Sequence, residues 1–178
     1  MNPRRVAIVG AECVGKTELA QALAESLPGL WIPEYLREFC DREGRTPRPD
    51  EQPHILAEQR RREEEAIDRA RAGRLGWVLA DSAPLVTAVY SEYLFGDESL
   101  FAAAVEHHAV YETTLLLAPD LPWVADGIQR DGPAVREACH RLLLRRLQAH
   151  GLRFVLIGGA GPLRLQAAIA ALRDLQSF

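Results

Sequence analysis

The sequence predicts an α/β protein in which a parallel sheet is covered by helices on both faces. Short, uninterrupted apolar runs recur along the chain, and such runs are typical of strands buried on both sides. Longer segments with apolar residues at helical spacing separate them, and strands joined through helices run parallel in one sheet. With 178 residues and no internal repeat or low-complexity linker, we expect a single domain spanning residues 1–178.

The apolar runs set the strands, and the helical spacing sets the helices. The strands are expected at residues 6–9, 30–32, 77–80, 113–117 and 154–157. The helices are expected around Leu19–Leu27, at 34–42, from about 50 to 72, at roughly 84–95 and 98–108, around Val135–Leu147 and around Leu165–Leu172. Within the long central helix, Arg60–Glu65 carries interleaved charge of both signs, so we expect this run on a solvated face.

Composition narrows the class of protein. The net charge is −4 and the isoelectric point about 5.8, so nothing indicates binding to nucleic acid or to an anionic membrane. The three cysteines form no C-x-x-C pair and the five histidines form no ligand-spaced set, which argues against a disulfide framework and a zinc site. No apolar run approaches a membrane span. We therefore expect a cytoplasmic protein; the oligomeric state stays open.

The segment GAECVGKT, residues 10–17, fits the pattern G-x-x-x-x-G-K-[ST] and lies between a buried strand and an amphipathic helix. Gly10 and Gly15 allow the backbone to wrap with its N–H groups pointing at phosphate oxygens, and the following helix adds its N-terminal partial charge. Lys16 is the only lysine beside twenty arginines. A compact ammonium fits this tight loop where a planar guanidinium does not. The segment therefore predicts binding of a nucleoside triphosphate, with Thr17 directed at Mg²⁺.

Asp81 ends the third apolar strand, where a carboxylate would hold Mg²⁺ across from Thr17, directly or through water. Strand carboxyl ends line the ligand crevice of open α/β sheets, which favours this interpretation. The alternative is that Asp81 caps the helix that starts near Pro84, because Asp-Ser-Ala-Pro is also good capping chemistry.

The segment PEYLRE, residues 33–38, follows the second strand and by the same rule faces a second substrate. Glu34 is a candidate to accept the proton of an attacking hydroxyl or to hold a sugar diol, with Arg37 beside it. The alternative is that Glu34 complements a helix N-terminus and that Arg37 forms a surface ion pair. The sequence leaves both open.

A long loop at about residues 118–133 follows the fourth strand and is the expected lid. Arg130 is placed to neutralise charge that develops on the phosphates during transfer. Trp123 would either stack on a planar ring or anchor the loop as an apolar plug. Asp126 would contact substrate or hold the loop through Arg130.

Together, GAECVGKT, PEYLREF, VLADSAPLVTAVY and LLLAPDLPWVADGIQR resemble the kinase domain of the NadR-type nicotinamide riboside kinases. The resemblance covers about residues 5–158, and the P-W-V-A-D-G-x-x-R loop is its most specific part. The chain differs from the family pattern in having Cys13 and Val14 for two serines, Thr17 for a third, and Ser82-Ala83-Pro84 after Asp81.

The resemblance implies a three-layer α/β/α P-loop kinase fold with a five-stranded parallel sheet in the order 2-3-1-4-5, and phosphorylation of nicotinamide riboside by ATP-Mg. It places Lys16, Asp81, Arg130 and Glu34 in catalysis, and Thr17 and Asp81 at the metal. It also places Glu34, Arg37, Trp123 and Asp126 at the substrate. The nucleotide-binding residues that it implies are Gly10, Glu12, Cys13, Val14, Gly15, Lys16 and Thr17.

Three functions remain to be weighed. The favoured one is a kinase that moves the γ-phosphoryl group of ATP to a nucleoside-like hydroxyl, with nicotinamide riboside or another nucleoside or nucleotide as acceptor. A nucleotide acceptor would require several pocket arginines, and only Arg37 is an obvious one. A regulatory ATPase would require a residue that positions water, and none is evident near Asp81. A binding module without turnover would show a large exposed apolar patch, and the sequence indicates none.

Overall fold

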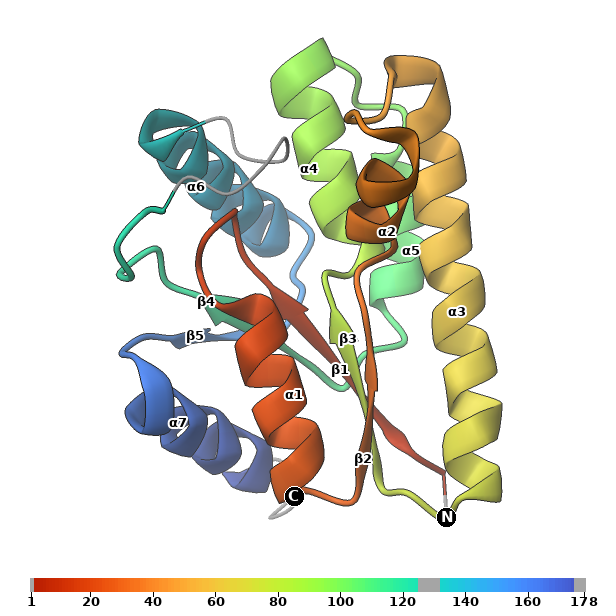
Figure 1. The fold of residues 1–178 in the computed structure, drawn as a ribbon, viewed down its shortest axis with the longest axis vertical. Helices are drawn as coiled ribbons and strands as arrows, with labels where there is room; N and C mark the ends of the chain where they lie inside the picture. Colours follow the sequence, from red (N-terminus) through yellow and green to blue (C-terminus); the bar gives the residue numbers. More distant parts are fainter. Residues whose placement is uncertain (1, 125–131, 175–178) are drawn as a thin grey trace.

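The computed structural model describes residues 2–124 and 132–174, and it contains a five-stranded parallel sheet in the order β2-β3-β1-β4-β5 (Figure 1). The predicted α/β class and strand order are confirmed. The strands are β1 (Arg4–Val9), β2 (Gly29–Ile32), β3 (Trp77–Asp81), β4 (Thr113–Leu117) and β5 (Phe154–Ile157). Each run expected from the sequence forms a strand, and the largest extension is β1, which begins at Arg4.

The helices also lie where their spacing predicts. They are α1 (Lys16–Ser26), α2 (Tyr35–Glu43), the short 3₁₀ helix η1 (Pro49–Glu51), α3 (Gln52–Ala72), α4 (Pro84–Phe95), α5 (Phe101–His108), α6 (Pro133–Ala149) and α7 (Gly161–Asp174). Glycine in the left-handed conformation ends α2 at Gly44 and α4 at Gly96. None of the helices in the described part of the chain is long and apolar enough to cross a bilayer.

Two cores hold helices against opposite faces of the sheet. On one face, α1 and α7 pack on the sheet through buried residues such as Leu19, Leu23 and Leu172. On the other face, α4, α5 and α6 pack through residues such as Leu85, Ala104 and Leu143. A smaller core on α3 covers β2 and β3. The arrangement is three-layered, as Figure 1 shows.

The strand register brings the functional segments to one edge of the sheet. β1 lies between β3 and β4, with Ile8 opposite Asp81 and Val9 opposite Leu116. The parallel strands therefore end together, so the turn after β1, the carboxylate at the end of β3 and the segment after β4 meet at this edge.

Candidate active site

The turn between β1 and α1 has the geometry of an anion-binding loop. A Cβ added at Gly10 would lie 2.8 Å from Val14 Cγ2, so any larger residue there would force part of the turn to shift. Cys13 and Gly15 have φ values of 54° and 77°, in the left-handed region. Such reversals of backbone handedness turn successive N–H groups toward one point, and α1 starts directly afterward with no side-chain cap on its free N–H groups. The segment is suited to a phosphate chain.

Lys16 is held inside this loop by its own backbone. Its ammonium Nζ donates a hydrogen bond to the carbonyl of Ala11 at 2.9 Å. One bond uses one of the three ammonium donors, and the other two are left for an anion in the loop. The position agrees with a lysine directed at the terminal phosphates.

Thr17 and Asp81 meet across the edge of the sheet. The Thr17 hydroxyl donates a hydrogen bond to Asp81 Oδ2 at 2.6 Å. Asp81 makes no cap on α4, because the N-cap position is Ala83 and carries no side-chain cap bond. The structure therefore directs the carboxylate at Thr17 rather than at the start of the helix.

Asp81 is unusual electrostatically. It is 1% exposed, and its burial raises the pKa of the carboxyl to about 6. The negative charge of Glu34 adds to this rise, whereas Lys16 and the Thr17 hydroxyl lower the pKa of Asp81. Its second oxygen, Oδ1, is buried without a hydrogen-bond partner. A carboxylate kept buried with a free oxygen beside a hydroxyl suits a divalent cation.

The donors here fit Mg²⁺ rather than a metal held by protein alone. Within the described ranges, no three His, Cys, Asp or Glu side chains gather into a metal site. Mg²⁺ usually takes only one or two protein oxygens and completes its shell with water and substrate phosphates. Thr17 and Asp81 provide that number of protein oxygens beside the phosphate loop.

A cavity opens beside the loop, with about 110 Å³ available to the centres of water molecules. Five residues singled out from the sequence line it, namely Glu12, Cys13, Lys16, Glu34 and Arg37. The cavity is also lined by residues that the sequence did not indicate: Gln52 on α3, and Thr87 and Tyr90 on α4. Their positions inside helices with ordinary apolar spacing gave no indication that they face a cavity. We call this space the acceptor cavity below.

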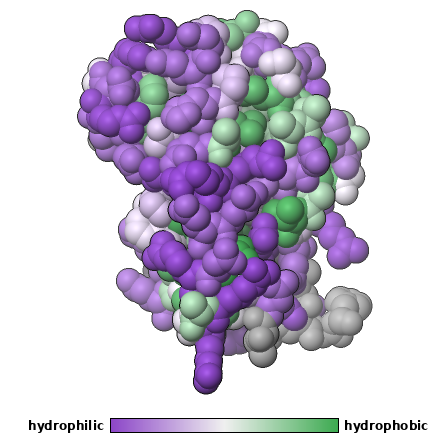
Figure 2. Space-filling model, turned by 90° about the vertical axis from the view of Figure 1, so that its right-hand side faces the viewer, coloured by the Kyte–Doolittle hydropathy of each residue, from purple (hydrophilic) through white to green (hydrophobic). Residues whose placement is uncertain are grey.

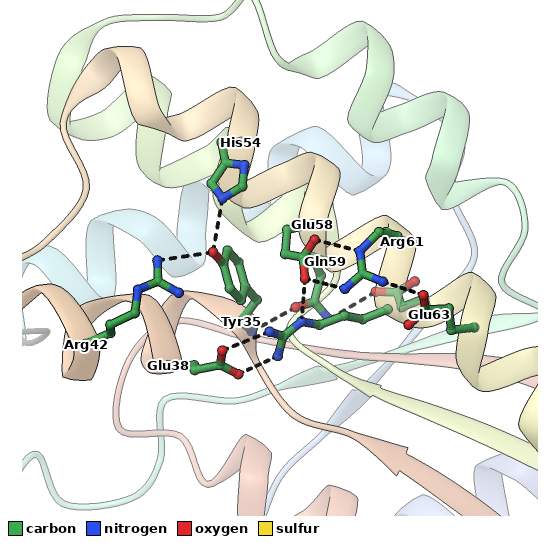
Figure 3. Close-up of polar contacts among 10 residues, drawn as sticks. Tyr35, Glu38, Arg42, His54, Glu58, Gln59, Arg61 and Glu63 are labelled. Atoms are coloured by element: carbon green, nitrogen blue, oxygen red, sulfur yellow. Dashed lines mark hydrogen bonds and ion pairs between the residues drawn. The ribbon is translucent and has the colours of Figure 1, made fainter.

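Glu34 and Arg37 reach the acceptor cavity because α2 is fixed against α3. The amide N–H of Tyr35 donates to Gln59 Oε1 at 2.9 Å, which holds the first residue of α2 (Figure 3). The Tyr35 hydroxyl bonds with His54 Nε2 at 3.0 Å, and the guanidinium of Arg62 lies 4.5 Å from the centre of the Tyr35 ring. Glu34 occupies the N-cap position of α2 and makes no side-chain cap bond. Its carboxylate thus remains directed to the site.

One residue of the charged run is buried, so the expectation that the whole of Arg60–Glu65 faces solvent is wrong at Glu63. Glu63 is 2% exposed and accepts hydrogen bonds from Gln59 Nε2 at 3.2 Å and from Tyr111. It also contacts His107 Nε2 at 2.8 Å. These partners compensate the burial of the carboxylate. The remaining face of α3 is charged, and Figure 2 shows that side of the molecule as largely hydrophilic.

Glu12 ties the phosphate loop to both ends of the predicted lid. Its carboxylate Oε1 accepts hydrogen bonds from Trp123 Nε1 at 3.2 Å and from the amide of Gly132 at 3.1 Å. Trp123 is half-buried in this contact and is not among the residues that line the acceptor cavity. Asp126 and Arg130 lie outside the described residues.

A second cavity lies on the other side of the loop. It is mainly apolar and is lined by Gly15, Leu19, Leu121, Pro162 and Leu165, among others. We call it the donor cavity. The phosphate loop therefore separates two cavities, one bordered by Lys16 and the other by Gly15.

Arg164, which sequence analysis did not single out, braces the donor cavity. It is 3% exposed, and its guanidinium donates to the carbonyl of Val14, to the carbonyl of Gly159 at 2.6 Å and to the carboxylate of Asp120. Asp120 Oδ2 also accepts from the amide of Gly159 at 2.7 Å. The loops after β1, β4 and β5 are thereby joined through one side chain. Two of its partners, Val14 and Asp120, are too far from it in sequence for any local pattern to reveal.

Comparison with known proteins agrees with this geometry. A family model described as an AAA domain matches residues 5–163. The chain belongs to this AAA domain family. This chain is 24% identical over 164 residues to the trifunctional NAD biosynthesis/regulator protein NadR of Salmonella typhimurium. The match covers 85% of this chain and 37% of NadR, so the chain spans only about a third of the length of that relative.

Solved structures show the same fold. This chain superposes on a NadR protein in complex with NR with a TM-score of 0.83 at 21% identity, and the match covers 99% of this chain and 52% of the NadR chain. A thymidylate kinase from Ehrlichia chaffeensis gives a TM-score of 0.67 at 15% identity, covering 97% and 100%. The fold is thus that of P-loop kinases, and the resemblance to NadR-type proteins drawn from the motifs is confirmed as a similarity of sequence and fold.

Proposed function

We propose that this protein is a kinase that transfers the γ-phosphoryl group of ATP to a hydroxyl of a nucleoside-like acceptor, nicotinamide riboside. The observation that carries the proposal is the pair of cavities on either side of the phosphate loop. A kinase needs a site for each of its two substrates with the transferred group between them. The mainly apolar donor cavity suits a nucleotide base, and the acceptor cavity with its carboxylate and cations suits a polar acceptor.

In this proposal some residues of the site bind the two substrates and others neutralise the charge of the phosphates. The amides of residues 10–17 and the Lys16 ammonium hold the phosphate chain. Thr17 and Asp81 would hold Mg²⁺, which when bound neutralises phosphate charge. Glu34, at the N-cap of α2, is assigned to the acceptor hydroxyl and accepts its proton. Arg37 is assigned to binding the acceptor beside Glu34.

Two lid residues, Asp126 and Arg130, are given roles here on the basis of the sequence alone. We assign Arg130 to the charge that develops during transfer, and Asp126 to the acceptor. Trp123 is assigned to the boundary between lid and phosphate loop, because its indole donates to Glu12. The choice of nicotinamide riboside is supported by the motif resemblance and by the similarity to a NadR protein in complex with NR.

The test is ATP consumption measured against a panel of acceptors with Mg²⁺ present. We expect ADP release that depends on nicotinamide riboside, with one phosphorylated riboside formed per ADP, because water is a poor competitor for an acceptor bound beside the loop. Adenosine, cytidine, thymidine and thymidine monophosphate serve as comparison acceptors in the same assay.

Two results would contradict the proposal in different ways. ADP release at the same rate with and without any acceptor would favour a regulatory ATPase. Turnover with a different nucleoside and none with nicotinamide riboside would keep the kinase and reject the acceptor. Omission of Mg²⁺ from a reaction that otherwise works provides the control for the metal.

A further inference from the structure

The acceptor cavity is lined by a largely buried polar side chain, Gln52, whose carboxamide has no hydrogen-bond partner among the described residues. Gln52 is the first residue of α3, is 5% exposed and lines the cavity. Its carboxamide makes no hydrogen bond with the described residues, whereas its backbone amide bonds with the carbonyl of Pro49. The carboxamide oxygen and nitrogen are not fully enclosed by protein, so they remain open to the cavity and available to a ligand that enters it.

Another glutamine on the same face of α3 shows what a structural role looks like. Gln59 lies seven residues further along the helix and is 3% exposed. Both ends of its carboxamide are used, since Oε1 accepts from the Tyr35 amide and Nε2 donates to Glu63 (Figure 3). Gln59 does not line the acceptor cavity. The two residues are alike in burial and differ in that only Gln52 keeps its donor and acceptor directed to the cavity.

The neighbouring helix contributes a second polar group of this kind. Thr87 of α4 is 9% exposed, lines the cavity and makes no side-chain hydrogen bond with the described residues. The wall around these groups is otherwise apolar, with Leu36, Val86 and Leu94 among its members. A small number of unpaired polar groups in an apolar wall is the usual composition of a site that orients a ligand.

We propose that Gln52 determines acceptor specificity by pairing with an amide edge on the acceptor ring, that is, a donor next to an acceptor. A carboxamide offers one N–H donor beside one carbonyl acceptor, and its complement is a second group with the same two functions in reverse order. A carboxylate provides acceptors only and cannot satisfy the Gln52 carbonyl. This inference rests on the proposed function and adds to it the chemical feature by which the acceptor is selected.

The experiment compares nicotinamide riboside with nicotinic acid riboside, in which a carboxylate replaces the carboxamide. Wild-type protein is expected to prefer the carboxamide by about 100-fold in kcat/KM, because a site built for hydrogen bonding leaves its polar groups unpaired with the wrong partner. Gln52→Met keeps the size of the side chain and removes both polar functions. We expect it to raise the KM for nicotinamide riboside by about tenfold or more and to leave kcat within about threefold.

Two further variants make the test specific. Gln52→Glu retains an acceptor and removes the donor, and we expect it to weaken nicotinamide riboside binding at neutral pH as Gln52→Met does. Leu94→Met changes an apolar residue of the same cavity and is expected to leave the preference between the two ribosides unchanged. Riboside binding is also measured by calorimetry without ATP, so that affinity is obtained independently of turnover.

The outcomes separate the two proposals. If wild-type protein phosphorylates nicotinamide riboside and Gln52→Met, shown to be folded by circular dichroism, keeps both the KM and the carboxamide preference, then Gln52 binds only water and this inference is wrong. If wild-type protein neither binds nor phosphorylates nicotinamide riboside, the proposed acceptor is wrong, and with it the amide edge assigned to Gln52. A loss of the carboxamide preference confined to the Gln52 variants supports both.

Discussion

Lys16→Arg is expected to lower phosphoryl transfer by about 100- to 1,000-fold although the positive charge is kept. The ammonium donates to the Ala11 carbonyl at 2.9 Å, inside a turn in which a Cβ at Gly10 would lie only 2.8 Å from Val14 Cγ2. A planar guanidinium cannot both keep this bond and follow the phosphates as a compact charge does. The measurement is acceptor-dependent ADP release, together with binding of a non-hydrolysable ATP analogue.

The matched control for this variant is the reverse exchange on the surface. Arg61 lies on α3 with 53% of its side chain exposed and pairs with Glu58 and Glu65. Arg61→Lys is expected to leave the rate within about twofold, because exposed ion pairs contribute little. Near-normal turnover by Lys16→Arg would remove the role assigned to the phosphate loop.

Asp81→Asn is expected to produce a more stable protein that has lost most of its activity. Loss of the carboxylate charge beside Thr17 should lower Mg²⁺-dependent turnover by about 100-fold. In the absence of ligands, the same change removes a buried charge. The pKa of Asp81 is raised from 3.8 to about 6, which corresponds to at most about 3 kcal/mol of destabilisation at pH 7.

The pH dependence of unfolding distinguishes this explanation from a general effect of the substitution. Because the folded protein holds the Asp81 proton more tightly than the unfolded chain does, the stability from this proton is fully present below about pH 3.8. It is lost as pH rises through about 6. The stability gain of Asp81→Asn over wild type is therefore expected to be near zero at pH 4 and to reach its maximum above pH 6, as measured by urea unfolding without Mg²⁺. An equal gain at both pH values would contradict it.

The sequence predicts the fold of this protein well because its elements are set by local patterns. Four-residue apolar runs such as Phe154–Ile157 are too short for helices, whereas the leucines of α1 recur every four residues, close to the helical repeat and unlike the two-residue alternation of a strand. The phosphate loop is equally local, since one turn between one strand and one helix contains all its parts. Lys16 and Thr17 could therefore be assigned before any coordinates.

The parts that the sequence did not reveal depend on contacts between distant segments. Arg164 bonds to the carbonyl of Val14, 150 residues away, and appears in the sequence as one more arginine on an amphipathic helix. Glu63 belongs to a charged run, yet Tyr111 and His107 from a later part of the chain hydrogen-bond with its carboxylate and so compensate the cost of its burial. Gln52 is recognised only when its place on the cavity wall and its lack of hydrogen bonds to the described residues are both known. Contacts between residues so distant in sequence arise only in the folded chain and leave no local sequence pattern.

The attachment of α2 has a consequence for how the protein responds to ionic strength. On its outer side, Glu38 forms an ion pair with Arg62 of α3, and dissolved salt screens this partly exposed pair. Its first residue is held by an uncharged hydrogen bond inside the protein, from the Tyr35 amide to Gln59, which salt does not weaken. Concentrated electrolyte would thus weaken the contact that Glu38 makes with α3, while Tyr35 stays fixed and the adjoining carboxylate of Glu34 keeps its place beside the phosphate loop.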